Sequence, residues 1–298
     1  MHNATLPTLL LAIALTACGG GGGADGDNGS ITRFTVEQAD LTESSGLARS
    51  QRADDLYWSH NDSGGPTDVY AFDGAGNTRG VLHLAPTLNL DWEDVSSFSE
   101  GGEPYLLVGD IGDNSAIRPS VRFYIVGEPA LDDSAATVNA APTQTTIVRY
   151  PDGARDCESI AVDADEGMVY LLSKRDAVPH LYRVPLHPTS LIVSAEALGE
   201  INIPRAPADA ESPERINWVT SMDFDAERRR AAVVTLTQAY VYTRGDGESW
   251  ADAFQRAPSA YALPDDPQIE AIAFSADGQE LLVTSEGSPT PAAHLALD

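Results

Sequence analysis

The sequence predicts an all-β protein that folds as a single β-propeller of five blades. The first observation is a pattern that recurs five times, at intervals of about 50 to 65 residues. The second is that each recurrence carries about four short segments rich in β-forming residues, which is the signature of propeller blades. The third is that no amphipathic helix of about ten residues stands out, so parallel α/β folds fit poorly. A β-sandwich with long loops is the alternative fold.

The chain begins with a segment that we expect to be removed. Residues 1–17 contain no Asp, Glu, Lys or Arg, and 9–15 form an apolar run about half as long as a membrane span. Such a run followed by small residues is typical of a signal peptide. Its end, Leu15-Thr16-Ala17-Cys18, resembles the bacterial lipobox, which implies a lipidated Cys18 at the start of the mature protein. The alternative is an ordinary signal peptide cleaved near Ala17, and the lack of Lys and Arg at residues 1–3 departs from the usual pattern.

Residues 18–30 are expected to form a flexible tether, with residues 31–298 as the propeller domain. The glycines at 19–23 and the polar stretch after them offer too little apolar surface to fold. Gly19 directly after the Cys, with no Asp there, resembles lipoproteins that are passed on to the outer membrane of Gram-negative bacteria. This resemblance implies a protein of the bacterial cell envelope that meets the membrane only through its lipid anchor.

The composition limits the partners. The formal net charge is −27, which argues against nucleic acid and anionic membrane surfaces and favours cations. Once Cys18 is lipidated, Cys157 is the only thiol left, so no intramolecular disulfide can form. We expect a monomer that is stabilised by packing, helped by a metal, and that takes a small molecule or a protein as its ligand.

The repeated segments define the blades in chain order. First strands, in which a polar start runs into small and apolar residues, are expected at 43–48, 93–98, 158–162, 220–224 and 270–274. Second strands are continuous apolar runs, which suit strands buried on both faces, at 56–58, 105–108, 169–172, 231–234 and 280–283. Third strands follow at 69–72, 122–126, 180–184 and 239–242, and weaker fourth strands at 79–84 and 146–150.

The two ends of the domain predict how the ring closes. The last repeat stops after its third strand, at 294–297, whereas residues 31–36 form a spare strand before the first repeat. We expect residues 31–36 to supply the outer strand of the last blade, which closes the ring and covers an unpaired edge. Six blades remain an alternative if residues 127–150 or 199–218 hide a degenerate blade.

Polar residues at the starts of the first strands predict a metal site. The first strand of a blade lines the central channel and the second runs antiparallel to it, so first-strand starts and second-strand ends share one face. We expect the metal ligands to be Glu43, Glu93, Glu158, Ser221 and Glu270. Because like charges at close range cannot all stay ionised, a hard cation that accepts many oxygens, Ca²⁺, is the simplest occupant. The alternative is that these glutamates accept hydrogen bonds from backbone N–H groups of neighbouring blades.

Further polar residues are expected at the same channel mouth. His60, Asp62 or Asp94 could act as a base and Lys174 or Arg175 as a phosphate clamp; the alternative for His60 is a purely structural, hydrogen-bonded role. We expect the ligand-binding residues to be Asp110, Asp113, Asn114, Arg175 and Glu286. The loop 109–114 has the composition of a calcium loop but lacks the EF-hand spacing. No Gly-x-Ser-x-Gly and no His-Glu-x-x-His motif occurs.

The motifs resemble those of a group of secreted bacterial β-propeller proteins for which no activity can be carried over. The matching segments are 43–48, 59–64, 91–94, 109–114, 150–153 with Asp156 and Glu158, and 270–274. More distantly, the chain resembles calcium-activated nucleotidases and propeller phytases. The resemblance to the nucleotidases implies Ca²⁺ in the channel and cleavage of nucleoside diphosphates, with Glu43/Ser45, Glu93, Glu158/Ser159 and Glu270 in matching positions, but their basic cluster is poorly represented.

Three functions follow from these observations. The first is a binding module of the cell envelope, with Ca²⁺ at the channel. The second is a Ca²⁺-dependent phosphohydrolase, in which the metal polarises a phosphoryl oxygen. The third is an assembly scaffold without a small ligand.

Overall fold

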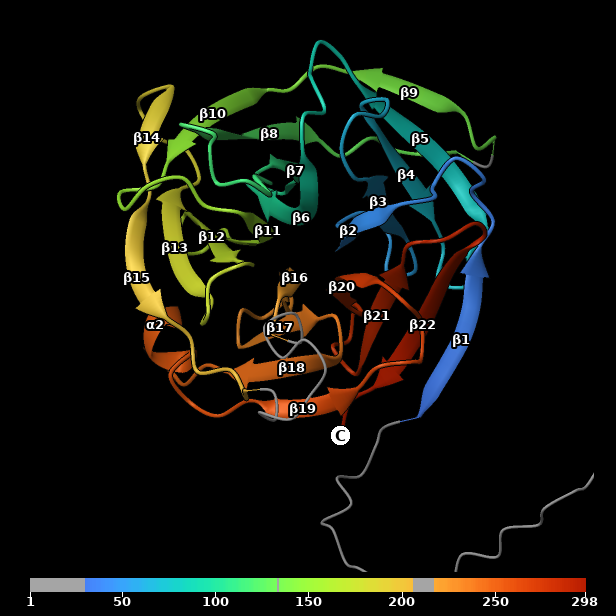
Figure 1. Cartoon of the computed structure of the whole chain (residues 1–298). Helices are drawn as coiled ribbons and strands as arrows, with labels where there is room; N and C mark the ends of the chain where they lie inside the picture. The colour runs from blue at the N-terminus through green and yellow to red at the C-terminus, as the bar shows by residue number, and fades with distance from the viewer. Residues whose placement is uncertain (1–29, 133, 206–216) are drawn as a thin grey trace, which may run out of the picture.

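Five β-sheets surround a central axis in the computed structural model, which describes residues 30–132, 134–205 and 217–298 (Figure 1). The predicted signal peptide, Cys18 and the tether up to residue 29 lie outside the described residues. The innermost strands of neighbouring sheets lie against one another in the order β2, β6, β11, β16, β20 and back to β2. The prediction of a single five-bladed β-propeller is therefore confirmed.

Each blade is an antiparallel sheet whose strands follow one another outward from the axis. Blade 1 contains β2 (Ser44–Arg49), β3 (Tyr57–Asn61), β4 (Asp68–Phe72) and β5 (Thr78–Leu84). Blade 2 contains β6 (Trp92–Glu100), β7 (Glu103–Asp110), β8 (Val121–Gly127) and β10 (Gln144–Arg149). Blade 3 contains β11 (Cys157–Asp163), β12 (Met168–Ser173), β13 (His180–Pro185) and β15 (Glu196–Glu200). Blade 4 contains β16 (Val219–Phe224), β17 (Arg230–Thr235), β18 (Gln238–Thr243) and β19 (Ser259–Ala262).

Blade 5 combines the two ends of the domain. It contains β20 (Ile269–Phe274), β21 (Glu280–Ser285) and β22 (Thr290–Ala296), and β1 (Ile31–Val36) is its outermost strand. β1 runs antiparallel to β22, with Ile31 opposite Leu295 and Val36 opposite Thr290. The predicted closure by residues 31–36 is confirmed.

Two short strands that the sequence did not predict extend the first two blades. β9 (Thr137–Ala140) pairs in parallel with β5 of blade 1, and β14 (Ile192–Ser194) pairs in parallel with β10 of blade 2. The alternative of six blades is wrong, because residues 127–150 supply β9 and β10 to existing blades and the described part of 199–218 carries only strand ends. α2 (Trp250–Ala253) is a short helix capped by Ser249, and no described helix is long and apolar enough to span a bilayer.

The hydrophobic core is divided into five clusters, one between each pair of neighbouring blades. Between blades 3 and 4, for example, Trp250 stacks on Phe224 at a centroid distance of 4.0 Å, and Tyr170 meets Phe224 edge-on. The second strands are buried on both faces because each blade packs against two others. This explains why their sequences are apolar without alternation.

The carboxyl group of Asp94 is fully buried among the innermost strands. Asp94 Oδ1 accepts hydrogen bonds from Val95 N at 2.9 Å and Ser221 Oγ at 3.1 Å. Asp94 Oδ2 accepts from Ile160 N at 2.9 Å and Met222 N at 3.3 Å. The carboxyl group therefore joins the backbones of blades 2, 3 and 4. Burial raises the pKa of Asp94, and these four donors act against that shift.

Gly46 allows blade 1 to pack closely against the backbone of Asp94 and Val95, because it has no side chain. A Cβ atom at Gly46 would lie 2.5 Å from His60 Nε2, 2.6 Å from Val95 N and 2.7 Å from Asp94 Cα. Two of these atoms belong to the backbone of the next blade, so the overlap cannot be relieved by turning a side chain.

We predict that Gly46→Ala destabilises the protein by about 3 kcal/mol or more, because the substitution pushes blades 1 and 2 apart. Thermal unfolding of the variant measures this effect. Gly65→Ala is the matched control, because no atom lies within 4 Å of the added Cβ there. Equal melting temperatures for the two variants would contradict the close approach at Gly46.

Candidate functional site

Every innermost strand begins with a β-bulge, which inserts one extra residue opposite the second strand. The extra residues occupy equivalent positions in the five blades and are Ser45, Glu93, Glu158, Thr220 and Glu270. A bulge turns a side chain away from the regular alternation of a strand. The mouth of the channel thus carries three glutamates and two hydroxyl residues at equivalent positions.

Two of the predicted metal ligands do not occupy bulge positions. Glu43 lies two residues before its blade's bulge and is exposed, outside the cavity at the mouth. Ser221 lies one residue after the bulge of blade 4, where it is buried and donates to Asp94. The sequence pattern of a polar start followed by apolar residues does not reveal which residue forms the bulge.

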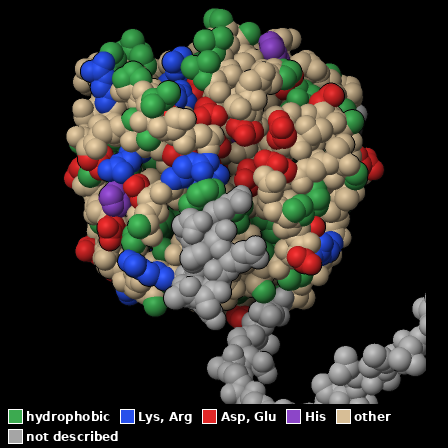
Figure 2. Space-filling model, in the orientation of Figure 1, with side chains coloured by type: hydrophobic (Ala, Val, Ile, Leu, Met, Phe, Trp, Pro, Cys, Tyr) green, Lys and Arg blue, Asp and Glu red, His purple; other side chains and the backbone are tan. Residues whose placement is uncertain are grey.

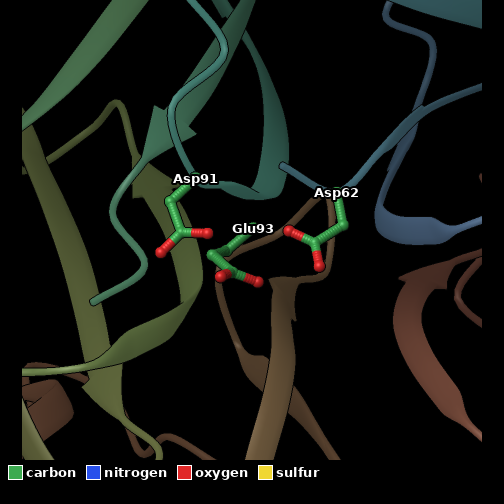
Figure 3. A group of neighbouring side chains, drawn as sticks. All are labelled: Asp62, Asp91 and Glu93. Carbon is green, nitrogen blue, oxygen red and sulfur yellow. The ribbon is translucent and has the colours of Figure 1, made fainter. Parts of the chain in front are cut away.

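Three carboxylates from blades 1 and 2 face one another at the mouth (Figure 3). Asp62 follows β3, Asp91 precedes β6, and Glu93 is the bulge residue of β6; each offers an oxygen within 4.8 Å of the others. Two loop contacts hold them, since Asn89 Nδ2 donates to the carbonyl of Asp62 at 2.7 Å and Gly112 N to that of Asp91 at 3.2 Å. We call Asp62, Asp91 and Glu93 the carboxylate triad.

Gly112 permits the approach of two triad members. A Cβ atom there would overlap Glu93 Oε1 and would lie 2.6 Å from Asp91 Oδ2. The carboxylates thus occupy space beside the backbone that any other residue would fill. The sequence pointed to the acidic residues of the loop 109–114. The loop instead supports the triad through Gly112, which leaves space for the carboxylates.

A second group of carboxylates shares Glu93 but differs in its surroundings. Oxygens of Glu93, Asp156 and Glu158 also lie within 4.8 Å of one another. Glu158 forms a buried ion pair with Lys174. Asp156 accepts from Arg175 Nε at 2.6 Å and from Asp113 N at 2.8 Å. The charges of Asp156 and Glu158 are therefore balanced by nearby cations.

The triad has weaker compensation, because Lys174 acts on Glu93 and Asp62 and Arg118 acts on Asp91 only from beyond ion-pair distance. Glu93 is 3% exposed, and its carboxyl group accepts a hydrogen bond from the Ser45 hydroxyl, which donates to Glu93 Oε2 at 3.4 Å. No ion pair within 4.0 Å involves Asp62, Asp91 or Glu93 among residues 30–132, 134–205 and 217–298. A buried carboxylate with few donors is unfavourable unless it is protonated or a cation lies beside it.

The pKa values at the mouth follow from this crowding. Burial raises the pKa of Glu93 well above its usual value, and the charges of Glu158, Asp62 and Asp91 raise it further. Burial together with Asp62 raises the pKa of Asp91 to about 6. Burial raises the pKa of Glu158 to about 8, although Lys174 acts in the opposite direction.

The mouth also contains a cavity of about 250 Å³. Its described lining comprises Asp62, Glu93, Asn114, Glu158, Lys174, Arg175, Trp218, Leu236, Pro267, Gln268, Glu270 and Glu286. Figure 2 shows acidic side chains gathered near the middle of the disc, with basic side chains beside them. Burial, with Glu270 and other carboxylates nearby, raises the pKa of Glu286 to about 7. The predicted residues Asn114, Arg175, Glu270 and Glu286 are thus brought to the mouth.

Trp218 is a lining residue that sequence reasoning missed. The guanidinium carbon of Arg175 lies 4.4 Å from the centre of the Trp218 ring, and Lys174 Nζ lies 5.8 Å from it. Cations over an aromatic face are attracted by the ring. Trp218 directly precedes the first strand of blade 4, and this position could have indicated that it lies at the mouth, where the first strands begin.

Two predicted catalytic residues are buried away from the cavity. His60 is 0% exposed, its ring meets Trp92 edge-on at 5.6 Å, and its Nδ1 lies 3.0 Å from the carbonyl of Asn61. Asp94 is 0% exposed on the channel axis. Neither side chain contacts the cavity, whereas Asp62 and Lys174 line it. Of the four predicted catalytic residues, His60 and Asp94 are therefore buried at the centre, whereas Asp62 and Lys174 lie at the mouth.

Two predicted ligand-binding residues, Asp110 and Asp113, have structural contacts in their own loop. Asp110 is paired with Arg118, whose Nη2 lies 2.6 Å from Asp110 Oδ1. Asp113 accepts hydrogen bonds from Ile117 N at 2.9 Å and Arg118 N at 2.6 Å. Neither residue lines the mouth cavity, because these contacts direct both carboxylates into the loop.

Comparison with known proteins gives structural likenesses at low sequence identity. Neither a protein-family model nor a curated protein matches the sequence. Among solved structures, a luciferin-regenerating enzyme is 11% identical with a TM-score of 0.48, over 90% of this chain and 96% of that one. Hydrazine synthase from Kuenenia stuttgartiensis is 9% identical with a TM-score of 0.44, over 85% of this chain and 71% of that one. The sheet topology and the cavity of this structure themselves define a five-bladed β-propeller protein with an acidic site at one mouth of its channel.

The buried His60 generates a prediction about pH. Burial lowers the pKa of His60 from 6.5 to about 4, so the unfolded chain takes up its proton first as the pH falls. Stability from this residue is complete above pH 6.5 and is lost towards pH 4, by about 3 kcal/mol. Urea unfolding at pH 7.5 and pH 4.5 should show a smaller acid-induced loss for His60→Gln than for the wild type. Equal losses in both proteins would mean that His60 is not buried in its neutral form.

Proposed function

We propose that this protein is a ligand-binding module of the bacterial cell envelope that holds Ca²⁺ at the mouth of its propeller. The observation that carries the proposal is the charge imbalance of the carboxylate triad. Asp156 and Glu158 have cationic partners, whereas Asp62, Asp91 and Glu93 have none within 4.0 Å among the described residues. A bound cation would supply the missing charge.

The donor chemistry of the triad favours Ca²⁺ over softer metals. The converging atoms are all carboxylate oxygens, and no sulfur or imidazole nitrogen joins them among the described residues. Ca²⁺ accepts six to eight oxygens at flexible geometry, whereas Zn²⁺ and Cu²⁺ prefer nitrogen and sulfur. Three carboxylates leave positions for water or for oxygens of a ligand. An ion at the triad would thus help the adjoining cavity to hold a ligand.

The geometry favours binding over phosphoester hydrolysis. A hydrolase of the predicted kind needs a cation free to hold the phosphoryl group. Lys174 is paired with Glu158, and Arg175 is held by Asp156 and Asn114. Asp62, the one predicted base that lines the cavity, belongs to the triad itself. The cavity in turn favours a ligand-binding role over a pure scaffold.

The cellular placement rests on the sequence alone. The lipobox pattern ending at Cys18 supports attachment to the envelope through lipid. We propose the outer membrane as the site of attachment in a Gram-negative host.

We predict that Ca²⁺ raises the melting temperature by about 5 °C at concentrations 100-fold above its Kd, and that EDTA reverses the shift. Glu93→Gln should abolish the Ca²⁺ shift. The same variant in EDTA should melt above the wild type, because it removes a buried charge that repels its neighbours. Differential scanning fluorimetry measures both effects.

Glu103→Gln is the matched control, since it removes the same charge from an exposed position at the start of β7, outside the cavity. It should retain the full shift with Ca²⁺. A shift that is lost equally in both variants would assign the effect to general charge, and the absence of any shift in the wild type would refute the calcium site.

The affinity for Ca²⁺ should fall as the pH is lowered from 8 to 5.5. The ion binds ionised carboxylates, and the raised pKa of Asp91, about 6, means that protons compete for this carboxylate within this range. We expect a loss of about fourfold or more, measured by calorimetric titration at each pH. A constant affinity over this range would show that Asp91 does not bind the ion.

A further inference from the structure

A second cavity, of about 440 Å³, opens between blades 3 and 4 on the face opposite the mouth. The turns that join first to second strands contribute Glu166 and residues 227–229 to its lining, β13 contributes Arg183, and the loop after β18 contributes Arg244 and residues 245–249. First-strand ends lie at the opposite end of the channel from first-strand starts. This cavity therefore shares no lining residue with the acidic mouth.

Arginine is concentrated at this cavity. Four of the 17 arginines line it, in a chain whose formal net charge is −27. Three of the four are already paired with carboxylates: Arg183 with Glu196, Arg229 with Asp246, and Arg244 with Asp163 and Glu166. Arg228 is the exception, since no described carboxylate lies within 4.0 Å of its guanidinium group.

The guanidinium N–H groups of Arg228 have few hydrogen-bond acceptors within the described chain. Its Nη1 donates to the carbonyl of Asp225 at 2.7 Å, and its Nε is buried without an acceptor. The neighbouring Glu227 is exposed and forms no ion pair with it. The carboxylates nearby are engaged elsewhere, because Glu166 accepts from Tyr170 and Arg244, and Glu248 accepts from Gly245 N and Arg256. The charges of Asp223 and Arg228 interact, but the two residues form no ion pair within 4.0 Å. A guanidinium group without an ion pair among the described residues thus borders an open cavity.

The backbone of Arg228 adopts a conformation that favours glycine. Its φ is 55°, and Gly278 has a φ of 66° in the corresponding turn of blade 5. Both turns are closed by a hydrogen bond of 3.0 Å, from Arg228 N to Asp225 O and from Gly278 N to Ser275 O. An L-residue in this conformation is strained relative to glycine. Arginine at this position is therefore not explained by the stability of the turn.

Arg244 fixes the turn that carries Arg228. Arg244 Nε donates to the carbonyl of Arg228 at 2.9 Å. The Arg244 guanidinium carbon lies 4.3 Å from the centre of the Trp250 ring, and Trp250 Nε1 donates to Asp163 Oδ2 at 2.9 Å. These contacts hold Arg228 at the cavity before any ligand arrives, which lowers the entropic cost of binding.

We propose that this cavity binds a small oxyanion, a carboxylate or phosphate group, through the guanidinium group of Arg228 beside that of Arg244. Guanidinium groups form paired hydrogen bonds with both kinds of oxyanion. The site is independent of the function proposed for the mouth.

The test is calorimetric titration of the protein with inorganic phosphate and, separately, with succinate at low ionic strength. We expect saturable binding of at least one of them, and the arm that binds identifies the class of oxyanion. Arg228→Gly should weaken binding at least tenfold while raising the melting temperature, because glycine relieves the strained turn. Glu227→Gln should strengthen binding, because it removes a negative charge from the lining.

Arg33→Gln is the matched control. It causes the same change in net charge at an exposed pair with Asp266 and should change the affinity by less than twofold. Equal weakening in Arg228→Gly and Arg33→Gln would overturn the proposal, since the effect would be one of overall charge. The absence of saturable binding of both anions to the wild type would overturn it as well.

Discussion

The carboxyl group of Asp94 is the contact on which the centre of this propeller depends. It lies on the axis and accepts hydrogen bonds from blades 2, 3 and 4, while Ser221, which donates to it, accepts in turn from Ile272 N of blade 5 at 3.3 Å. Blade 1 comes close enough because Gly46 has no side chain. A buried carboxyl group is tolerated here because each of its oxygens is hydrogen-bonded. Replacing any one donor would leave a polar group unsatisfied at the most crowded point of the fold.

The acidic mouth lies at the starts of the innermost strands. The bulge residues of these strands occupy equivalent positions there. Three of the five are glutamates, and Asp62, Asp91 and Asp156 lie beside them. Lys174 and Arg175 compensate the side formed by blade 3 and leave the carboxylate triad on the side formed by blades 1 and 2. This uneven distribution of charge around a repetitive ring is the basis of the proposed cation binding at the triad.

The sequence predicted the repeat, the number of blades and the closure by residues 31–36, because buried strands and an unpaired strand leave a direct mark on the pattern. It placed Glu93, Glu158 and Glu270 at the mouth for the same reason. It did not reveal that Thr220, and not Ser221, is the bulge residue of blade 4, since the pairing register depends on the neighbouring strand. It also missed β9, β14 and Trp218, whose positions depend on contacts between distant segments. The structural role that was the alternative for the glutamates, accepting from backbone N–H groups of the next blade, belongs instead to Asp94, Ser96, Ser221 and Asp223.

The central claim is that a metal cation binds at the carboxylate triad, because no cationic side chain of the described mouth forms an ion pair with it. The most direct measurement is anomalous diffraction from crystals grown with Tb³⁺, an oxygen-seeking ion of a size similar to Ca²⁺. The account predicts one strong peak about 2.3 to 2.6 Å from oxygens of Asp62, Asp91 and Glu93. A peak between Asp156 and Glu158 with none at the triad, or no peak at the mouth at all, would contradict it.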